Sequence, residues 1–408
     1  MRTRGFSLIE LLVGVAVSVI VVAAAVALLT GTQRSFQGGV DDRAMQETAR
    51  VAMDELTTNL AQAGYGMEPT LVFDFGQAAT IQDEVPTGDQ VRFGGYNCTA
   101  PVTCRDSIAG PDEVVFYSRD PLWEKDLTGI VGVNSITLVG PIASPLQQGQ
   151  VLQVMCYGTN DQWLWAFVTV QSADATNPSA IQVSLAPSPG LPFDFPYQNS
   201  LLTQPCFGSG TRRAFKIDRY RYYIQAVDGA GNPQAWETPG TRPYLMLDQG
   251  LASSPAAIAA DVEDLQVAYV FPLAAAGSQL IGATAGTAVA EGANGIDLAP
   301  ALGIPSFSTP SLDPTRTTNH PANIQAVRVA ITVRSERSDL TCTDPACTQL
   351  PASLNRPAWP GEPGYKRMVF DATTYVHNMM TRLAVFPTYD PSYNLPTCAD
   401  NAGNCGGG

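Results

Sequence analysis

Apolar residues fill the first part of the chain and predict a membrane-spanning helix. Glu10 is the only charged residue between Arg4 and Arg34, and the apolar stretch from Leu11 to Leu29 follows it directly. About 20 apolar residues, at a helical rise of ~1.5 Å per residue, cross the hydrocarbon core of a bilayer. Because Arg2 and Arg4 precede the stretch, the positive-inside tendency leaves the N-terminus in the cytoplasm and exports the rest of the chain.

The helical pattern continues past the membrane segment as one apolar stripe. Polar positions such as Asp42, Glu47 and Asp54 fall largely on other faces. From Phe6 to about residue 63 the helix would be roughly 87 Å long, and glycines at 64 and 66 predict its end. The stripe is expected to pack against a globular domain. Its members recur at steps of three and four: Met45, Ala49, Ala52, Leu56, Leu60 and Ala63.

Short runs of β-branched and aromatic residues, separated by Pro, Gly, Asn and Asp, predict strands after the helix. One long helix followed by many strands indicates an α+β fold with a mostly antiparallel sheet. The partial alternation from Val327 to Arg334 predicts a central strand. The predicted strands are 113–118, 135–139, 151–157, 164–171, 180–185, 219–227, 244–247, 262–271, 324–334 and 366–378.

Two segments are expected to be loop insertions in this domain. Residues 68–112 hold many turn formers and a close pair of cysteines. Residues 273–322 are rich in Ala, Gly, Ser, Thr and Pro and carry few charges. The second segment is either a flexible surface loop or a loop that binds a partner.

The charge balance argues against nucleic acid as a partner. Only 15% of the residues are charged, against about 25% in typical soluble domains. The 37 acidic residues outnumber the 23 basic ones, and the formal net charge is −14. Such a surface repels phosphate backbones, and the sequence has no basic cluster that would offset the repulsion.

The sequence contains no motif of a known catalytic class, and we expect no enzyme activity, cofactor or metal. The Gly-x-Ser-x-Gly elbow, the His-Glu-x-x-His motif, the P-loop and the dinucleotide fingerprint are all missing. His320 and His377 are isolated, and His377 is expected to have a structural role in a strand. The turn from Asp228 to Asn232 could hold Ca²⁺ through oxygen ligands, but a hairpin turn is the favoured interpretation.

Eight cysteines in an exported domain indicate an oxidising compartment. Eight cysteines allow 105 pairings, and near neighbours are the simplest choice. The expected disulfides are Cys98–Cys104, Cys342–Cys347 and Cys398–Cys405, with Cys156–Cys206 as the long pair.

The string from Arg4 to Val13, Arg-Gly-Phe-Ser-Leu-Ile-Glu-Leu-Leu-Val, resembles the type III signal of type IV pilins and pseudopilins. The resemblance implies that a prepilin peptidase cuts after Gly5 and N-methylates Phe6, and that Glu10 pairs with the terminal amine of a neighbouring subunit. The alternative is an ordinary secretory signal, for which Ala25-Val26-Ala27 offers a cleavage site. Against that alternative, the apolar core exceeds the usual 7–15 residues.

The stretches 49–56 and 61–65 resemble the PilW type of minor pilin, and weaker similarity covers 262–269, 324–334 and 367–378. Many major pilins have a proline where this chain has Ala27, which weakens the case for a bulk subunit. The expected organisation is a leader at 1–5, a transmembrane and assembly helix at 6–29, its amphipathic continuation at 30–66 and a globular β-rich domain at 67–408.

The resemblance implies a non-enzymatic minor pilin that helps initiate a type IV pilus and sits at or near its tip. The implied partners are other minor pilins, the major pilin, a tip adhesin, the inner-membrane assembly platform and the prepilin peptidase. The protein would lie in the inner membrane before assembly and at the pilus tip afterwards. The alternatives are a type II secretion pseudopilin of the J class, an adhesive tip subunit that binds a surface ligand and, least favoured, a membrane-tethered periplasmic enzyme.

Overall fold

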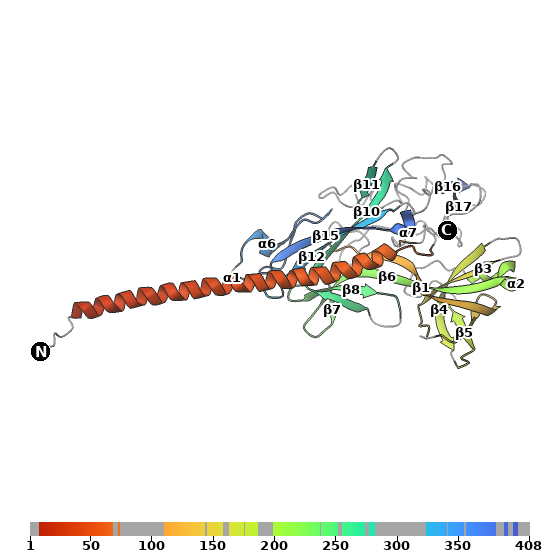
Figure 1. Ribbon diagram of the computed structural model, residues 1–408, viewed down its shortest axis with the longest axis horizontal. Coiled ribbons are helices and arrows are strands. Elements are labelled where there is room, and N and C mark those ends of the chain that lie inside the picture. The colour runs from red at the N-terminus through yellow and green to blue at the C-terminus, as the bar shows by residue number, and fades with distance from the viewer. Residues whose placement is uncertain are drawn as a thin grey trace.

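The computed structural model shows one long helix, α1 (Leu8–Gln62), whose C-terminal half packs against a β-rich domain (Figure 1). The fold is the expected α+β arrangement with antiparallel sheets. The structure describes residues 8–67, 72–73, 110–142, 145–157, 163–174, 176–186, 199–236, 238–251, 255–273, 277–281, 324–340, 342–354, 356–380, 387–390 and 395–398.

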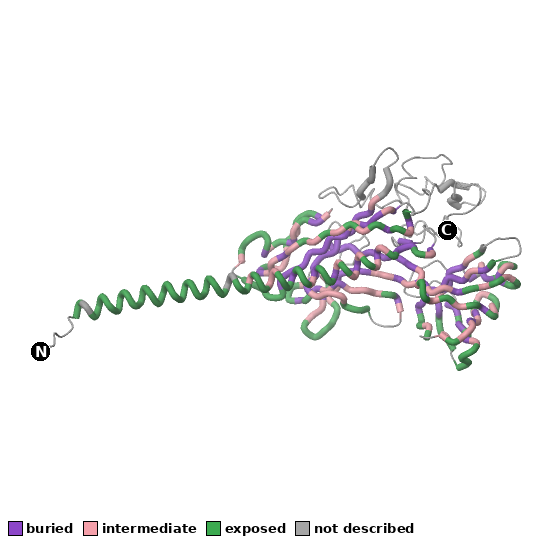
Figure 2. The backbone as a smooth tube through the Cα atoms, in the orientation of Figure 1, coloured by how far each residue is buried: buried purple, intermediate pink, exposed green. Residues whose placement is uncertain are grey.

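Helix α1 has 55 residues and is therefore about 82 Å long at ~1.5 Å per residue. All six members of the predicted apolar stripe are buried, none more than 2% exposed, so the prediction of a docking face is confirmed (Figure 2). The helix ends where the glycines predict, because Gly64 has φ 78° and Gly66 has φ 63°. These left-handed conformations are easily adopted only by glycine.

The larger sheet has nine strands and contains most of the first half of the domain. Its strand order is β1-β2-β5-β4-β3-β6-β8-β9, with the short strand β7 paired to β6. The strands are β1 (Val114–Val131), β2 (Ser135–Val139), β3 (Val151–Tyr157), β4 (Trp163–Asp174), β5 (Ala180–Leu185), β6 (Thr211–Val227), β7 (Pro233–Gln234), β8 (Arg242–Asp248) and β9 (Ala256–Ala260).

Strands β1 and β6 are much longer than the sequence predicts, and this difference creates a second lobe. The run Ser118-Arg119-Asp120-Pro121 resembles a turn, but β1 passes through it with a shift in register between Arg119 and Glu124. A bulge of this kind tolerates a proline in a strand. Because β1 pairs with both β2 and β6, the strands β1, β2, β5, β4, β3 and β6 close into a barrel.

The barrel has its own apolar core, which includes Leu152, Val154 and Val168. The disulfide Cys156–Cys206 joins β3 to the short helix α2 (Pro205–Ser209), which follows the 3-10 turn η2 (Asn199–Thr203). This barrel lobe lies at the end of the molecule opposite the N-terminus (Figure 1).

A four-stranded sheet, with the order β11-β10-β12-β15, covers another side of α1. The prediction that 327–334 forms a central strand is confirmed, because β12 pairs with both β10 and β15. The strands are β10 (Val262–Leu273), β11 (Gly277–Ile281), β12 (Ala326–Arg334) and β15 (Arg367–Tyr375). Short elements complete the described chain: α6 (Pro345–Thr348), β13 (Gln349–Leu350), β14 (Trp359–Pro360), α7 (His377–Met380), β16 (Pro387–Asp390) and β17 (Leu395–Cys398).

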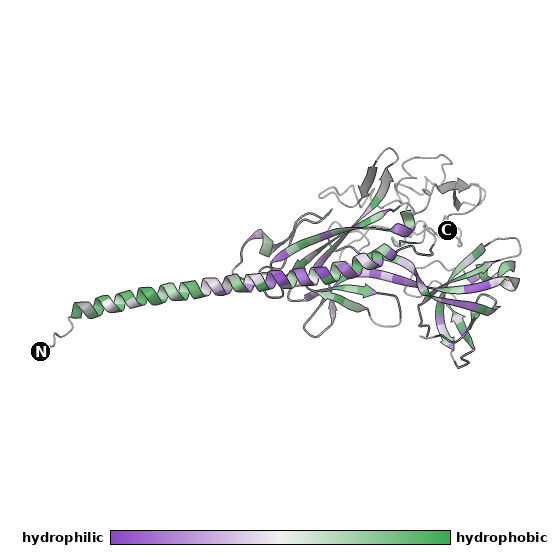
Figure 3. Ribbon diagram, in the orientation of Figure 1, coloured by the Kyte–Doolittle hydropathy of each residue, from purple (hydrophilic) through white to green (hydrophobic). Residues whose placement is uncertain are grey.

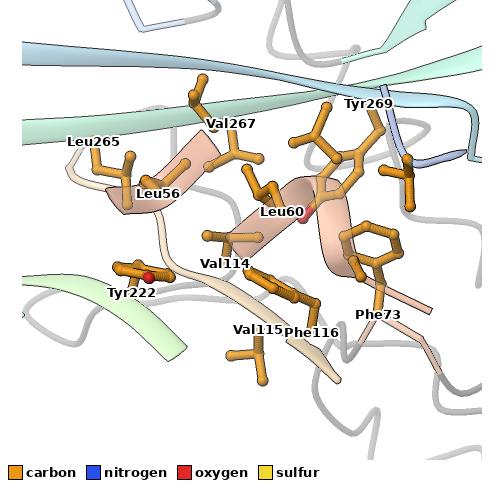
Figure 4. Packing of buried hydrophobic residues seen from close by; sticks show 14 of the residues in the cluster. Leu56, Leu60, Phe73, Val114, Val115, Phe116, Tyr222, Leu265, Val267 and Tyr269 are labelled. Atoms are coloured by element: carbon orange, nitrogen blue, oxygen red, sulfur yellow. The ribbon is translucent and has the colours of Figure 1, made fainter. Parts of the chain in front are cut away.

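The main core lies where both sheets meet α1 (Figure 4). Leu56 and Leu60 project from the helix between β10 and β1, and the ring of Phe73 lies edge-on to that of Tyr269 at 5.6 Å. Asn59 Nδ2 donates a 2.7 Å hydrogen bond to the hydroxyl of Tyr222. Burial raises the pKa of this hydroxyl above its usual range.

Two expectations need correction. His377 does not lie in a strand, because β15 ends at Tyr375 and the chain turns into helix α7. There the Nδ2 atom of Asn378 donates to the carbonyls of Gln62 and Ala63, which have no partner within α1. The expected insertion at 273–322 also contains the strand β11, which folds back on β10. Residues 274–276 and 282–322 of that segment, and most of 68–112, lie outside the described residues.

Replacing Leu56 by alanine is expected to destabilise the domain by ~2–5 kcal/mol, because the side chain is completely buried between the helix and both sheets. Alanine is the strongest helix former, so the loss would report packing and not helix propensity. Val51→Ala is the matched control, since Val51 is half-exposed on the same helix, and should change stability by at most ~0.5 kcal/mol. Urea unfolding of the chain in detergent would measure both, and equal losses would contradict the docking role of the stripe.

Candidate functional site

The exposed half of α1 is the most unusual surface of the described chain. Its residues are mostly hydrophobic (green in Figure 3), and their side chains are exposed, with Leu8 78% exposed and Leu28 72% exposed. Removing one such side chain from water is worth ~1.5–3 kcal/mol. The helix is long and apolar enough to cross a membrane by length and composition. This segment therefore requires a bilayer or neighbouring helices around it.

Three hydroxyl side chains of the apolar half donate hydrogen bonds to carbonyls of the helix itself. Ser18 donates to the carbonyl of Gly14 at 2.8 Å, and Thr30 donates to that of Val26 at 3.0 Å. Thr32 donates to the carbonyl of Leu29 at 2.9 Å. Because a bilayer offers no water for hydrogen bonds, such local pairing allows these hydroxyls to enter it at low cost.

Of the residues predicted to act in processing and assembly, the structure describes only Glu10, and only its backbone. Gly5 and Phe6 fall outside the described residues, whereas the backbone of Glu10 belongs to the first turn of α1. A carboxylate in the first turn gains ~0.3–1 kcal/mol from the helix dipole. A carboxylate at this position stabilises the helix, but its charge is costly within a bilayer. Ionisable residues in membrane-spanning segments usually have a function for this reason.

The structure contains two of the four expected disulfides. Cys156–Cys206 closes a separation of 50 residues and Cys342–Cys347 closes one of 5. Cys98, Cys104 and Cys405 lie outside the described residues, and Cys398 is the last residue of β17. The pairings Cys98–Cys104 and Cys398–Cys405 therefore stay predictions.

The turn from Asp228 to Asn232 is the hairpin that joins β6 to β7. The carboxylate of Asp228 accepts hydrogen bonds from the backbone N–H groups of Asn232 and Ala230, at 2.8 and 2.9 Å. Gln234 Nε2 donates to it as well, at 3.0 Å. These bonds, that from Asn232 foremost, lower the pKa of Asp228. The carboxylate of Asp228 stabilises the turn through these bonds, and this role accounts for the aspartate without any bound cation.

Sequence reasoning missed a group of buried charges in the second half of the domain. Glu263, Asp264 and Arg334 lie in strands and are less than 9% exposed. Charged residues are rarely buried without partners. The signal available in the sequence was the presence of charges inside otherwise apolar strands, at Val262-Glu263-Asp264-Leu265 and at Val333-Arg334.

Comparison with known families identifies the start of the chain. Residues 1–26 match the family described as the prokaryotic N-terminal methylation motif. No curated protein and no solved structure matches the chain. The motif supports a type IV pilin-like or pseudopilin subunit, which indicates a structural role. It also implies processing by prepilin peptidase and, with the apolar helix, agrees with anchoring in the inner membrane.

Proposed function

We propose that the chain is a PilW-type minor pilin that helps to initiate a type IV pilus and sits at or near its tip. The observation that carries the proposal is the methylation motif at 1–26, continuous with a helix whose first half is exposed and apolar. We assign residues 1–5 to a leader, 6–29 to the transmembrane and assembly helix, 30–66 to its amphipathic continuation and 67–408 to the globular domain.

In this proposal Gly5 is the last leader residue and Phe6 becomes the methylated N-terminus. Glu10 then pairs with the terminal amine of a neighbouring subunit within the low-dielectric centre of the filament, where the attraction between opposite charges is stronger than in water. The exposed apolar side chains of α1 pass from lipid to the helices of neighbouring subunits. The proposed partners are other minor pilins, the major pilin, a tip adhesin and the assembly platform.

The size of the domain supports a place at the tip. The barrel lobe extends the molecule at the end farthest from the membrane segment (Figure 1). A filament of one repeating subunit packs each globular domain against several copies of itself, and a large additional lobe is tolerated best where neighbours are fewer. The lobe would be free to contact an adhesin or a surface there.

Quantitative immunogold labelling of pili tests this placement. We expect a few copies per filament, at or near one end, and a sharp loss of piliation when the gene is deleted. Dense labelling along the shaft would overturn the tip assignment. A deletion that leaves piliation intact but blocks protein secretion would favour the J-class pseudopilin instead.

A further inference from the structure

A cleft of about 360 Å³ lies between the β7–β8 connection and the long connection from β12 to β15. The indole rings of Trp236 and Trp359 line it from these two connections. Prolines make up much of the remaining wall: Pro239, Pro243, Pro360 and Pro363. Aromatic side chains line several of the grooves in which proteins bind extended peptide segments.

The wall contributed by the β12–β15 connection is firmly built. The disulfide Cys342–Cys347 and the pairing of β13 with β14 shape it. The guanidinium of Arg356, which is completely buried, anchors it to Asp264 of β10 through bonds of 2.7 and 2.9 Å. The connection is thus held in place at the edge of the cleft.

The floor of the cleft carries charge. Arg334 Nη1 lies 3.3 Å from Glu263 Oε1 and 3.2 Å from Glu362 Oε2, so one guanidinium joins two carboxylates that line the cleft. The second terminal nitrogen, Nη2, donates to the carbonyl of Thr241 at 2.8 Å. The Cζ atom of Arg334 lies 4.2 Å from the ring centre of Tyr365. Both terminal nitrogens of Arg334 are thus engaged, whereas its Nε lies 3.8 Å from Asp261 Oδ1 without a hydrogen bond.

The charged residues that line the cleft carry an excess of negative charge, because Glu263 and Glu362 are acidic and Arg334 is basic. The ion-pair network extends beyond the lining to Asp261, Glu336, Arg242 and Arg367. Among the charged residues of the lining, the side chain of Glu362 is the most open, at 26% exposed against 6% for Arg334 and 9% for Glu263.

We propose that this cleft binds an arginine or lysine side chain presented by an extended segment of a partner protein. A cation would gain from the carboxylate of Glu362 and from the two indole rings, whereas the charge excess would repel an acidic side chain. The volume, near the lower end of the usual range for ligand sites, fits one long side chain and its backbone. The β12–β15 connection, which carries α6, lies at the end of the domain nearer to the exposed half of α1 (Figure 1).

Peptide titration of the full chain in detergent micelles tests the proposal. The probe is acetyl-Gly-Arg-Gly-amide, and its matched control replaces arginine by citrulline, which has the same shape without the charge. We expect saturable binding by calorimetry with the arginine peptide at low salt, at least ~10-fold weaker binding with the citrulline peptide, and weaker binding as salt increases. Free arginine should bind more weakly than the peptide, because it lacks the flanking backbone.

Variants of two glutamates test the site itself. Glu362→Gln should weaken binding of the arginine peptide at least ~10-fold, whereas Glu336→Gln should change it less than ~3-fold, because Glu336 is 66% exposed and does not line the cleft. Unchanged unfolding temperatures would show that both variants are folded.

Equal binding of the arginine and citrulline peptides, or no binding to the unaltered chain, would overturn the proposal. Free arginine binding as tightly as the peptide would overturn the role of an extended segment. Saturable binding of a neutral sugar such as N-acetylglucosamine, without binding of the arginine peptide, would assign the cleft to carbohydrate instead. The titration involves no filament, so its failure leaves the proposed pilin function standing, and the reverse also holds.

Discussion

The Gly5→Val variant is expected to accumulate as an uncut, unmethylated precursor and to be missing from filaments. The proposed cleavage follows a residue without a side chain, and a branched side chain at that position would obstruct the approach of the peptide bond to the protease. The uncut leader would also keep the basic residues Arg2 and Arg4 attached to the helix. Mass spectrometry of the immunopurified protein would measure the outcome, because the proposed processing would remove residues 1–5 and the proposed methylation would add one methyl group to Phe6.

Glu10→Ala is the matched control for the Gly5 variant. It leaves the cleavage residues intact and removes a carboxylate from the first turn of α1, so it should be cut and methylated but incorporated poorly. The pair of variants therefore separates processing from assembly. Normally processed protein from Gly5→Val would contradict the prepilin assignment, whereas normal incorporation of Glu10→Ala would contradict only the proposed pairing of Glu10.

The helix and its docking face could be predicted because their signals are local. Both the spacing of the apolar residues and the end of the helix can be read within one continuous segment. The stripe from Met45 to Ala63 has helical spacing, and Gly64 and Gly66 follow it directly. The methylation motif is likewise a continuous string at the N-terminus. Strands β2, β3 and β5 were predicted with their observed bounds for the same reason.

The barrel could not be predicted, because it depends on pairing between distant strands. The β1 register joins Val114 to Tyr222 and Asp126 to Arg213, and the string Asp120-Pro121 concealed the continuity of the strand. Strand period alone identifies which face is buried but not which strand is the neighbour. The sequence therefore predicts antiparallel strands without the closure that separates the barrel lobe from the sheet on α1.

The buried ion pairs could not be predicted from the sequence for a similar reason. Glu263 and Arg367 are 104 residues apart in the chain, and Asp264 and Arg356 are 92 apart. Each of these residues could have been an exposed charge on a strand edge or loop. Only the folded arrangement shows that they are partners and that Arg356 holds the β12–β15 connection, one wall of the cleft, to β10.

Replacing Arg356 by methionine is expected to destabilise the domain by ~3–5 kcal/mol at neutral pH, the usual cost of removing one partner of a buried ion pair. Both side chains are 1% exposed, and two nitrogens of Arg356 donate to the same oxygen of Asp264. Without the guanidinium, the Asp264 carboxylate would remain in a dry interior with Gln266 as its described side-chain donor. The midpoint of urea unfolding in detergent would measure the loss.

The dependence on pH and a second variant distinguish a charge effect from a packing effect. Burial already raises the pKa of Asp264, and loss of Arg356 would raise it further. A raised pKa of Asp264 in the folded state makes the folded protein bind a proton more readily than the unfolded chain. The loss of stability in Arg356→Met should therefore be largest above the folded-state pKa of Asp264, and it should shrink as the pH falls towards the unfolded-state value of ~3.9.

The double variant Asp264→Asn with Arg356→Met should recover more than half of the loss, because it removes both charges. A penalty that stays constant with pH and is not relieved in the double variant would show that Arg356 acts by filling space, and the β12–β15 connection would then be held by packing and not by its ion pair.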